Sequence, residues 1–226
     1  MRITKYLVVL LAAAMLCFPT FSQEKKITFG LMGGYGYTMP KLKDSRTIKN
    51  PSINGNSLNG FHVGPQLTIN FNQNSAFQTG LIYNFFTGTS IDKSQLALKK
   101  SVGNWYQYKT TLSAFDLPLR YVYSFPLAEN LSVFVFAGPN LNYALYKSTP
   151  KQIYINNKLD VEENKENIYS TSNYNRFDIQ IGGGGGIKWQ GIFVKANYDW
   201  GLLNRSNIVN ASLHSNDFKV SIGYNF

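Results

Sequence analysis

The chain has 226 residues, of which 44% are hydrophobic and 15% aromatic, a single cysteine and a formal net charge of +10. One cysteine excludes a disulfide framework and a metal site built from several thiolates. The positive charge comes without a helix-turn-helix, zinc-finger or other nucleic-acid recognition motif, so we expect no nucleic-acid partner.

The first residues have the pattern of a secretory signal peptide. Arg2 and Lys5 give a positive start, and a continuous apolar run follows from Tyr6 to Phe18. This run is shorter than the roughly 20 apolar residues of a membrane-spanning helix. We therefore predict a signal peptide over residues 1–22 and one mature domain over residues 23–226.

Cys17 lies inside this signal and raises an alternative, a lipoprotein signal. Lipidation normally needs a small residue in front of the cysteine, and Leu16 is large. We therefore expect Cys17 to leave with the signal peptide, so that the exported protein carries no thiol.

The rest of the chain contains eight segments in which apolar and polar residues alternate. Successive side chains of a strand point to opposite faces, so each segment has one apolar and one polar face. Only the fifth is irregular, because Phe134 and Phe136 are apolar on the otherwise polar face. In chain order the segments are Ile27–Met39, Asn59–Phe71, Ala76–Thr89, Tyr106–Phe125, Leu131–Tyr146, Tyr174–Trp189, Gly191–Leu203 and Asn216–Phe226.

The connections between these segments alternate in length. The short ones are Asn72–Ser75, Pro126–Asn130 and Gln190–Gly191, and the long ones are Met39–Leu58, Ser90–Trp105, Lys147–Asn173 and Asn204–Ser215. Outer-membrane barrels have an even number of strands, short periplasmic turns and long external loops. The pattern predicts an all-β fold, an eight-stranded antiparallel up-and-down transmembrane β-barrel, located in the cell outer membrane after the signal peptide is cleaved.

Alternation alone leaves the outward face open, because a soluble ligand-binding barrel has the same period with its apolar face inside. The polar faces here carry few charges, whereas a soluble exterior carries many. Aromatic residues gather near the ends of the apolar faces, where amphipathic rings meet lipid headgroups; they are Tyr35, Tyr37, Tyr121, Tyr123, Trp189, Tyr198, Trp200, Tyr224 and Phe226. We expect outer-membrane lipid and lipopolysaccharide around the barrel, and a soluble periplasmic barrel stays as the alternative.

Basic residues cluster in two of the predicted loops. A solvated loop surface explains them, and so does contact with anionic lipid headgroups. The residues are Lys41, Lys43, Arg46 and Lys49 in one loop, and Lys93, Lys99 and Lys100 in the other.

The polar faces place charged residues inside the predicted barrel. An eight-stranded barrel has an interior that side chains fill, and buried charges there must be paired and hydrogen-bonded. We therefore expect a structural plug of ion pairs, with a path for protons or small solutes as the alternative. The residues are Asp116, Arg120, Asp178, Lys188, Lys195, Asp199 and Lys219.

Residues that could carry chemistry are few. The run Gly182–Gly186 lies on a strand and does not match a phosphate-binding loop, so we expect either small residues at a strand bend or close packing beside a bulky lumen group such as Phe193. His62 and His214 are the only imidazoles. A serine–histidine site at the barrel rim needs a third orienting group, which the sequence does not place. We predict no catalytic, cofactor-binding or metal-binding residue and no enzyme, with a barrel-embedded lipid-modifying enzyme as the alternative.

Five segments resemble the strands of PorT-like outer-membrane β-barrel proteins of Bacteroidota. The first reads LSAFDLPLRY and resembles that family's YLEIPLxxKY strand, and the last reads IGYNF and resembles its terminal GYxF. In chain order they are Leu112–Tyr121, Val135–Pro139, Arg176–Asp178 with the glycines that follow, Val194–Asn204 and Ile222–Phe226.

Two positions depart from the family pattern, with Asp116 in place of Glu and Asn197 in place of Arg. The resemblance implies an outer-membrane barrel, and for the founding member a part in type IX secretion. We expect a structural or interaction role through the external loops, with protein partners there or in a secretion machinery.

Overall fold

The computed structural model describes residues 26–44, 57–91, 95–96, 98–99, 103–163 and 165–226. The predicted signal peptide, with Cys17, lies outside this part of the chain, as do Arg46, Lys49, Lys93 and Lys100. The elements are β1 (Ile27–Asp44), β2 (Leu58–Asn70), β3 (Ser75–Gly80), β4 (Ile82–Ser90), β5 (Trp105–Ala128), β6 (Leu131–Ser148), β7 (Lys151–Ile155), β8 (Lys158–Glu163), the 3-10 helix η1 (Ile168–Ser170), β9 (Phe177–Trp189), β10 (Ile192–Gly201) and β11 (Ala211–Asn225).

The strands close into a ring by antiparallel pairing. β1 pairs with β2 on one side and with β11 on the other, so the first and last strands seal the sheet. β3 and β4 share one position between β2 and β5, separated only by Leu81, whose backbone N–H donates to the carbonyl of Pro65 at 3.2 Å. With β3 and β4 counted together the ring has eight strands, and the predicted all-β, up-and-down transmembrane barrel is confirmed.

The apolar face of the strands points outward. Along β11, Val220 is 40% exposed and Ile222 is 59% exposed, whereas Lys219 between Phe218 and Val220 is 5% exposed and Ser221 is 2% exposed. A soluble ligand-binding barrel has the opposite arrangement, with the apolar side chains around a central cavity. The outer surface is therefore matched to lipid tails and the lumen to polar groups.

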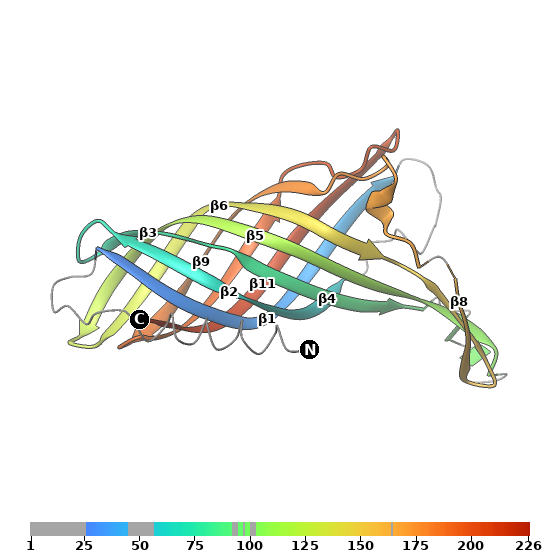
Figure 1. The fold of residues 1–226 in the computed structure, drawn as a ribbon, viewed down its shortest axis with the longest axis horizontal. Coiled ribbons are helices and arrows are strands. Elements are labelled where there is room, and N and C mark those ends of the chain that lie inside the picture. Colours follow the sequence, from blue (N-terminus) through green and yellow to red (C-terminus); the bar gives the residue numbers. More distant parts are fainter. Residues whose placement is uncertain (1–25, 45–56, 92–94, 97, 100–102, 164) are drawn as a thin grey trace, which may run out of the picture.

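The two ends of the barrel differ (Figure 1). The tight β5–β6 and β9–β10 turns and the C-terminus lie at one end, and β8 lies at the other. Gln190 in the β9–β10 turn has a positive φ of 53°, which fits a two-residue hairpin turn. In the part of the chain that the structure describes, no helix is long and apolar enough to cross a membrane.

The long connection predicted over Lys147–Asn173 is in fact partly folded. It contains the hairpin β7–β8 and the short helix η1. β7 pairs with the first residues of β5, in the register Trp105 with Tyr154 and Tyr108 with Lys151. β5 is 24 residues long, far more than a bilayer needs, so β5, β7 and β8 form a three-stranded external sheet beyond the ring.

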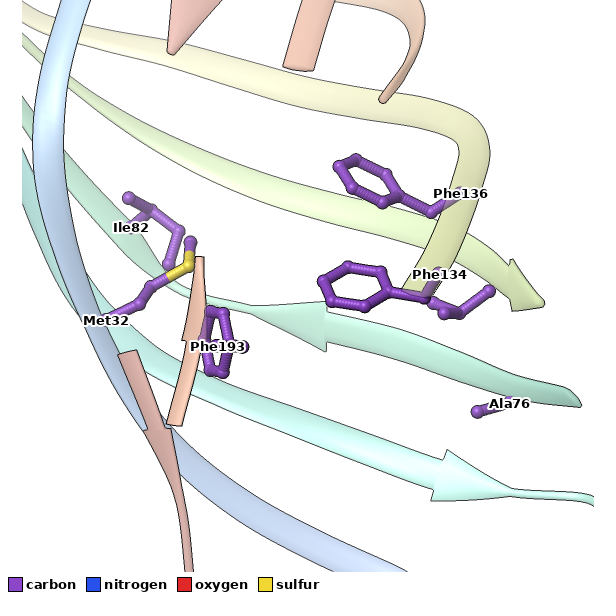
Figure 2. Close-up of a cluster of buried hydrophobic side chains, with 7 residues drawn as sticks. Met32, Ala76, Ile82, Phe134, Phe136 and Phe193 are labelled. Carbon is purple, nitrogen blue, oxygen red and sulfur yellow. The ribbon is translucent and has the colours of Figure 1, made fainter. Parts of the chain in front are cut away.

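An apolar cluster fills part of the barrel interior (Figure 2). The irregular fifth segment explains it, because Phe134 and Phe136 of β6 point into the lumen and are each 6% exposed. The other members of the cluster are Met32, Ala76, Ile82, Val122 and Phe193. The interior is therefore divided between an apolar packing region and a polar network.

Candidate functional site

Two buried ion pairs form the centre of the polar network. Arg120 of β5 pairs with Asp199 of β10, and Lys219 of β11 pairs with Asp116 of β5. Asp116 also accepts a hydrogen bond from Nδ2 of Asn142 at 2.7 Å. Each pair joins strands that are not neighbours in the ring, so together they tie opposite walls of the barrel.

Arg120 also bonds to the backbone. The ladder between β5 and β6 skips the positions of Leu119 and Arg120, and the guanidinium donates to the carbonyl oxygen of Gly138 and, at 3.1 Å, to that of Gly182. Gly138 has a φ of +150°, and a Cβ there would overlap the backbone of Leu119. The glycine thus allows the ladder between β5 and β6 to be interrupted. The guanidinium of Arg120 then provides a hydrogen-bond donor for the carbonyl groups beside the interruption.

Lys195 and His62 complete the network with neutral partners. Nζ of Lys195 donates to the amide oxygens of Gln66 at 2.8 Å and Gln78 at 2.9 Å, and it lies 5.4 Å from the ring centres of Phe136 and Phe193. Nε2 of His62 lies 2.8 Å from the hydroxyl of Ser221. These contacts cross from β10 to β2 and β3, and from β2 to β11.

Little free space remains among these side chains. A cavity of about 40 Å³ lies between the ion pairs and the apolar cluster, which is room for a few water molecules. The lumen therefore has the character of a packed interior rather than of an open channel.

A second polar cluster covers the end of the barrel that carries the long connections. Arg205, which is 4% exposed, donates to the hydroxyl of Tyr169 at 2.7 Å and to the side-chain oxygen of Asn142 at 3.3 Å. Arg176 holds the carbonyl of Leu145 at 2.6 Å. Burial raises the pKa of the Tyr169 hydroxyl, so this group stays neutral and accepts the hydrogen bond from Arg205. The cluster fixes η1 over the rim.

The external sheet has its own internal bonding. The rings of Trp105 and Tyr154 stack with centres 4.1 Å apart and planes 6° from parallel. Next to them the amide of Gln107 donates to Gln152 at 2.9 Å, and Gln152 donates to Glu162 at 3.0 Å. That hydrogen bond from Gln152 lowers the pKa of Glu162. A chain of side chains thus links β5, β7 and β8 and holds the hairpin in a fixed position.

Some of the charged residues predicted to lie in the lumen form ion pairs with one another, and others do not. Asp116, Arg120, Asp199 and Lys219 are paired as expected. Lys195 has amide oxygens instead of a carboxylate, and Asp178 accepts only from the backbone N–H of Leu203, at 3.2 Å, among the hydrogen bonds of the described residues. Lys188 is half-buried beside the β9–β10 turn. Alternation placed these side chains on the inner face, but only the strand register decides which of them meet.

The glycine run packs beside bulky lumen groups, as predicted, but the named partner was wrong. A Cβ at Gly186 would meet the ring of Phe134 at 2.6 Å, and one at Gly184 would meet the ring of Phe136 at 2.8 Å. Phe193 lies instead against Gly223 of β11. The pairing of β9 with β6 decides which rings meet the glycines, and this pairing cannot be derived from the sequence of either strand alone.

The two histidines do not form a site. His62 faces the lumen as predicted and is 1% exposed, whereas His214 lies opposite Lys41 in the β1–β11 pairing. Nδ1 of His62 has no hydrogen-bond partner among the described residues, so no third group orients the imidazole of the buried His62–Ser221 pair there. Among those same residues, no group of His, Cys, Asp or Glu could hold a metal ion.

Comparison with known proteins gives one family match. Residues 21–207 match the family model described as outer membrane protein beta-barrel domain. No curated protein matches the chain.

Several solved structures are similar at low identity. They include the attachment invasion locus protein Ail of Yersinia pestis, at 11% identity and a TM-score of 0.36, over 88% of this chain and 99% of that one. OprG of Pseudomonas aeruginosa is 11% identical with a TM-score of 0.45, over 88% of this chain and 95% of that one. Neisserial surface protein A is 10% identical with a TM-score of 0.37, over 88% of this chain and 97% of that one.

Proposed function

Because this chain belongs to the family of outer membrane protein beta-barrel domains, we propose that it acts as an interaction protein of the outer membrane, with a sealed structural lumen and a recognition surface in its external sheet. Residues 1–22 act in this proposal as an export signal that is removed. Mass spectrometry of the protein purified from the outer membrane tests that removal, with Gln23 as the expected first residue.

The single observation that carries the proposal is the contrast between the lumen and the external sheet. The lumen is occupied by paired charges and packed rings, with a cavity of only about 40 Å³. The external sheet extends past the ring, is braced by the Trp105–Tyr154 stack, and exposes Ile155, Leu159 and Val161. Exposed apolar groups on an ordered surface outside the lipid are typical of protein interaction sites.

The test is replacement of the hairpin, residues 151–163, by a glycine–serine linker of equal length. Intact and replaced proteins are expressed in the native cell at equal levels, cross-linked in the intact outer membrane and purified in detergent. We expect at least one cross-linked protein with the intact chain that is absent with the replaced chain. Identical cross-linking patterns for two correctly folded barrels would exclude the hairpin as the recognition surface.

A second candidate is a PorT-like part in type IX secretion, which the strand motifs support, Leu112–Tyr121 foremost. The test is deletion of the gene followed by measurement of cargo proteins on the cell surface, with the intact and the hairpin-replaced chains as complements. Normal surface cargo in the deletion strain would exclude this role and leave the more general proposal standing.

A further inference from the structure

A small cavity lies at the rim of the barrel and shares no lining residue with the lumen cavity. Its volume is about 10 Å³, which is room for one guest of the size of a water molecule. Three leucines and a proline form its apolar walls, and no carboxylate of the described chain lines it. The polar residues that line it are Thr38, Lys147, Tyr169, Arg205 and Ser215.

Lys147 contributes an ammonium group without a partner. The residue is half-buried, stands last but one in β6 and lies opposite Leu112 of β5, which also lines the cavity. Its backbone N–H donates to the side-chain oxygen of Asn167 at 3.2 Å, whereas its ammonium group makes no hydrogen bond or ion pair with a described residue. All N–H donors of this ammonium group are therefore available to a guest.

Arg205 and Tyr169 supply two further donors. A guanidinium has five N–H groups, and the four hydrogen bonds of Arg205 within the described chain go to oxygens of Asn142, Tyr169, Asn175 and Arg176. One N–H on Nη1 is left. The Tyr169 hydroxyl accepts from Arg205, which cannot accept in return, so the hydroxyl hydrogen is also available.

Positive charge exceeds negative charge around this cavity. Arg176 and Arg205 lie over the ring of Tyr169, with guanidinium carbons 5.3 and 5.7 Å from its centre, and neither forms an ion pair within the described chain. Asp178 offsets part of the charge of Arg205 but does not line the cavity. With Lys147, three cations therefore stand against one carboxylate.

The surroundings of Lys147 already disfavour its charge. β6 has 18 residues, and Lys147 lies beyond the roughly 9–11 with which a strand crosses the bilayer from its periplasmic end. Burial and the neighbouring guanidinium of Arg205 lower the pKa of its ammonium group to about 8. A negatively charged guest would relieve this repulsion.

The size and the donors of the cavity decide which guest fits. A tetrahedral oxyanion such as phosphate is much larger than a water molecule, whereas a chloride ion is only slightly larger. Water also fits, because the hydroxyls of Thr38 and Ser215 can accept its hydrogens. The excess of cations favours the anion, which accepts from every free donor and has no hydrogen of its own to place.

We propose that Lys147, Tyr169 and Arg205 bind one monoatomic anion, of which chloride is the common example, at the rim of the barrel. The anion accepts hydrogen bonds from the ammonium group, the phenol hydroxyl and the remaining guanidinium N–H. It thereby joins β6, η1 and the connection between β10 and β11, and it stabilises η1 at the rim. This site is independent of the external sheet and its proposed partner, so either proposal can fail without the other.

The direct test is crystallisation of the full chain from detergent with sodium bromide as the sole halide. Diffraction data collected at the bromine absorption edge should show an anomalous peak in the cavity, within hydrogen-bond distance of Nζ of Lys147. A cavity without an anomalous peak, whether or not it holds a water molecule, would overturn the proposal.

Hydrogen exchange tests the same site in solution. Chloride should slow backbone exchange in residues 167–170 relative to gluconate, an anion too large for the cavity, at equal ionic strength. Lys147→Gln should weaken the apparent chloride affinity about tenfold, because a charge-assisted hydrogen bond is lost. The control Lys158→Gln removes the same charge at an exposed position of β8 and should leave the affinity unchanged.

The outcomes in solution decide whether the site acts outside a crystal. Equal chloride effects in the two folded variants, or no chloride effect on the natural chain, would overturn the proposal. A bromide peak without a chloride effect would indicate binding at crystal concentration only and would overturn it as well. The peak and the chloride effect on the natural chain need no variant, so the test holds even if Lys147→Gln does not fold.

Discussion

At the scale of single residues, two buried ion pairs stabilise the lumen, and each charge has few other groups with which it could pair. Asp116 and Lys219 are buried partners, as are Arg120 and Asp199. Removing one member of such a pair leaves the other charge without compensation in an interior that has room for only a few waters. Replacing both members by apolar groups avoids that cost.

We therefore predict that Asp116→Ala lowers the free energy of unfolding by about 3–5 kcal/mol, and that Asp116→Leu/Lys219→Met regains most of the loss. Urea unfolding in detergent micelles, followed by tryptophan fluorescence, measures both variants. A single variant within about 1 kcal/mol of the natural protein would show that the pair is not a structural support.

Glycine positions give a second prediction at this scale. A Cβ at Gly223 would overlap the ring of Phe193 and lie 2.6 Å from the carbonyl oxygen of Leu31. Gly223→Ala should lower the free energy of unfolding by about 1–3 kcal/mol. The matched control is Gly33→Ala, whose Cβ would meet nothing nearer than the carbonyl of His62 at 3.3 Å and should cost clearly less. Equal costs for the two substitutions in the same unfolding assay would contradict the packing described for Phe193.

The lumen residues show most clearly what the alternation of apolar and polar residues can and cannot predict. It placed Asp116, Lys195 and His62 on the inner face, because a strand has a period of two. It did not pair Lys195 with Gln66 and Gln78, since that contact depends on the registers of strands far apart in the sequence. The inward direction of Phe134 and Phe136 was visible only as an irregularity.

At the scale of elements, the eight ring strands were predicted and the external sheet was not. β7 and β8 have only five and six residues, and the register shift at Asp160 puts Leu159 and Val161 on opposite faces, so neither strand has the long apolar face on which the other assignments depended. One signal was present in the sequence, because an asparagine pair favours the turn of a two-residue hairpin. In the structure Asn156 and Asn157 both have the positive φ of such a turn, 51° and 60°. The start of β11 at Ala211 rather than Asn216 was missed for a similar reason, because residues 211–215 are mostly small or polar.

The ring and the hairpin should be independent in stability. β7 pairs only with the first residues of β5 and with β8, and neither strand takes part in ring closure. We predict that replacing residues 151–163 by a linker leaves a folded barrel. The measurement is heat-modifiable migration on gels, with an unfolding midpoint in urea close to that of the intact chain. Loss of the fast-migrating folded form would show that the hairpin supports the ring.

At the scale of the whole molecule, pairing of β1 with β11 removes the open edges that a sheet in lipid cannot tolerate. In the external sheet, β8 is the outermost of the described strands and pairs with β7 alone. The barrel therefore separates a surface for lipid, a sealed interior and a water-exposed platform.

A sealed interior predicts no conductance. In planar bilayers the purified protein should give no discrete current steps above the background of the bilayer, because rings and ion pairs fill the lumen. The triple variant Phe134→Ala/Phe136→Ala/Phe193→Ala, if it folds, is the control that opens the apolar region. Reproducible openings by the natural protein would contradict a structural lumen.

The central claim is that apolar side chains meet lipid while their polar neighbours fill the barrel. Single cysteines placed in turn at Phe218, Lys219, Val220, Ser221 and Ile222, in a chain with Cys17→Ser, and labelled with a nitroxide in lipid vesicles, test it directly. The account predicts strong relaxation by lipid-soluble oxygen at 218, 220 and 222, and weak labelling or weak relaxation at 219 and 221. Accessibility with the opposite phase, or without any alternation along β11, would contradict it.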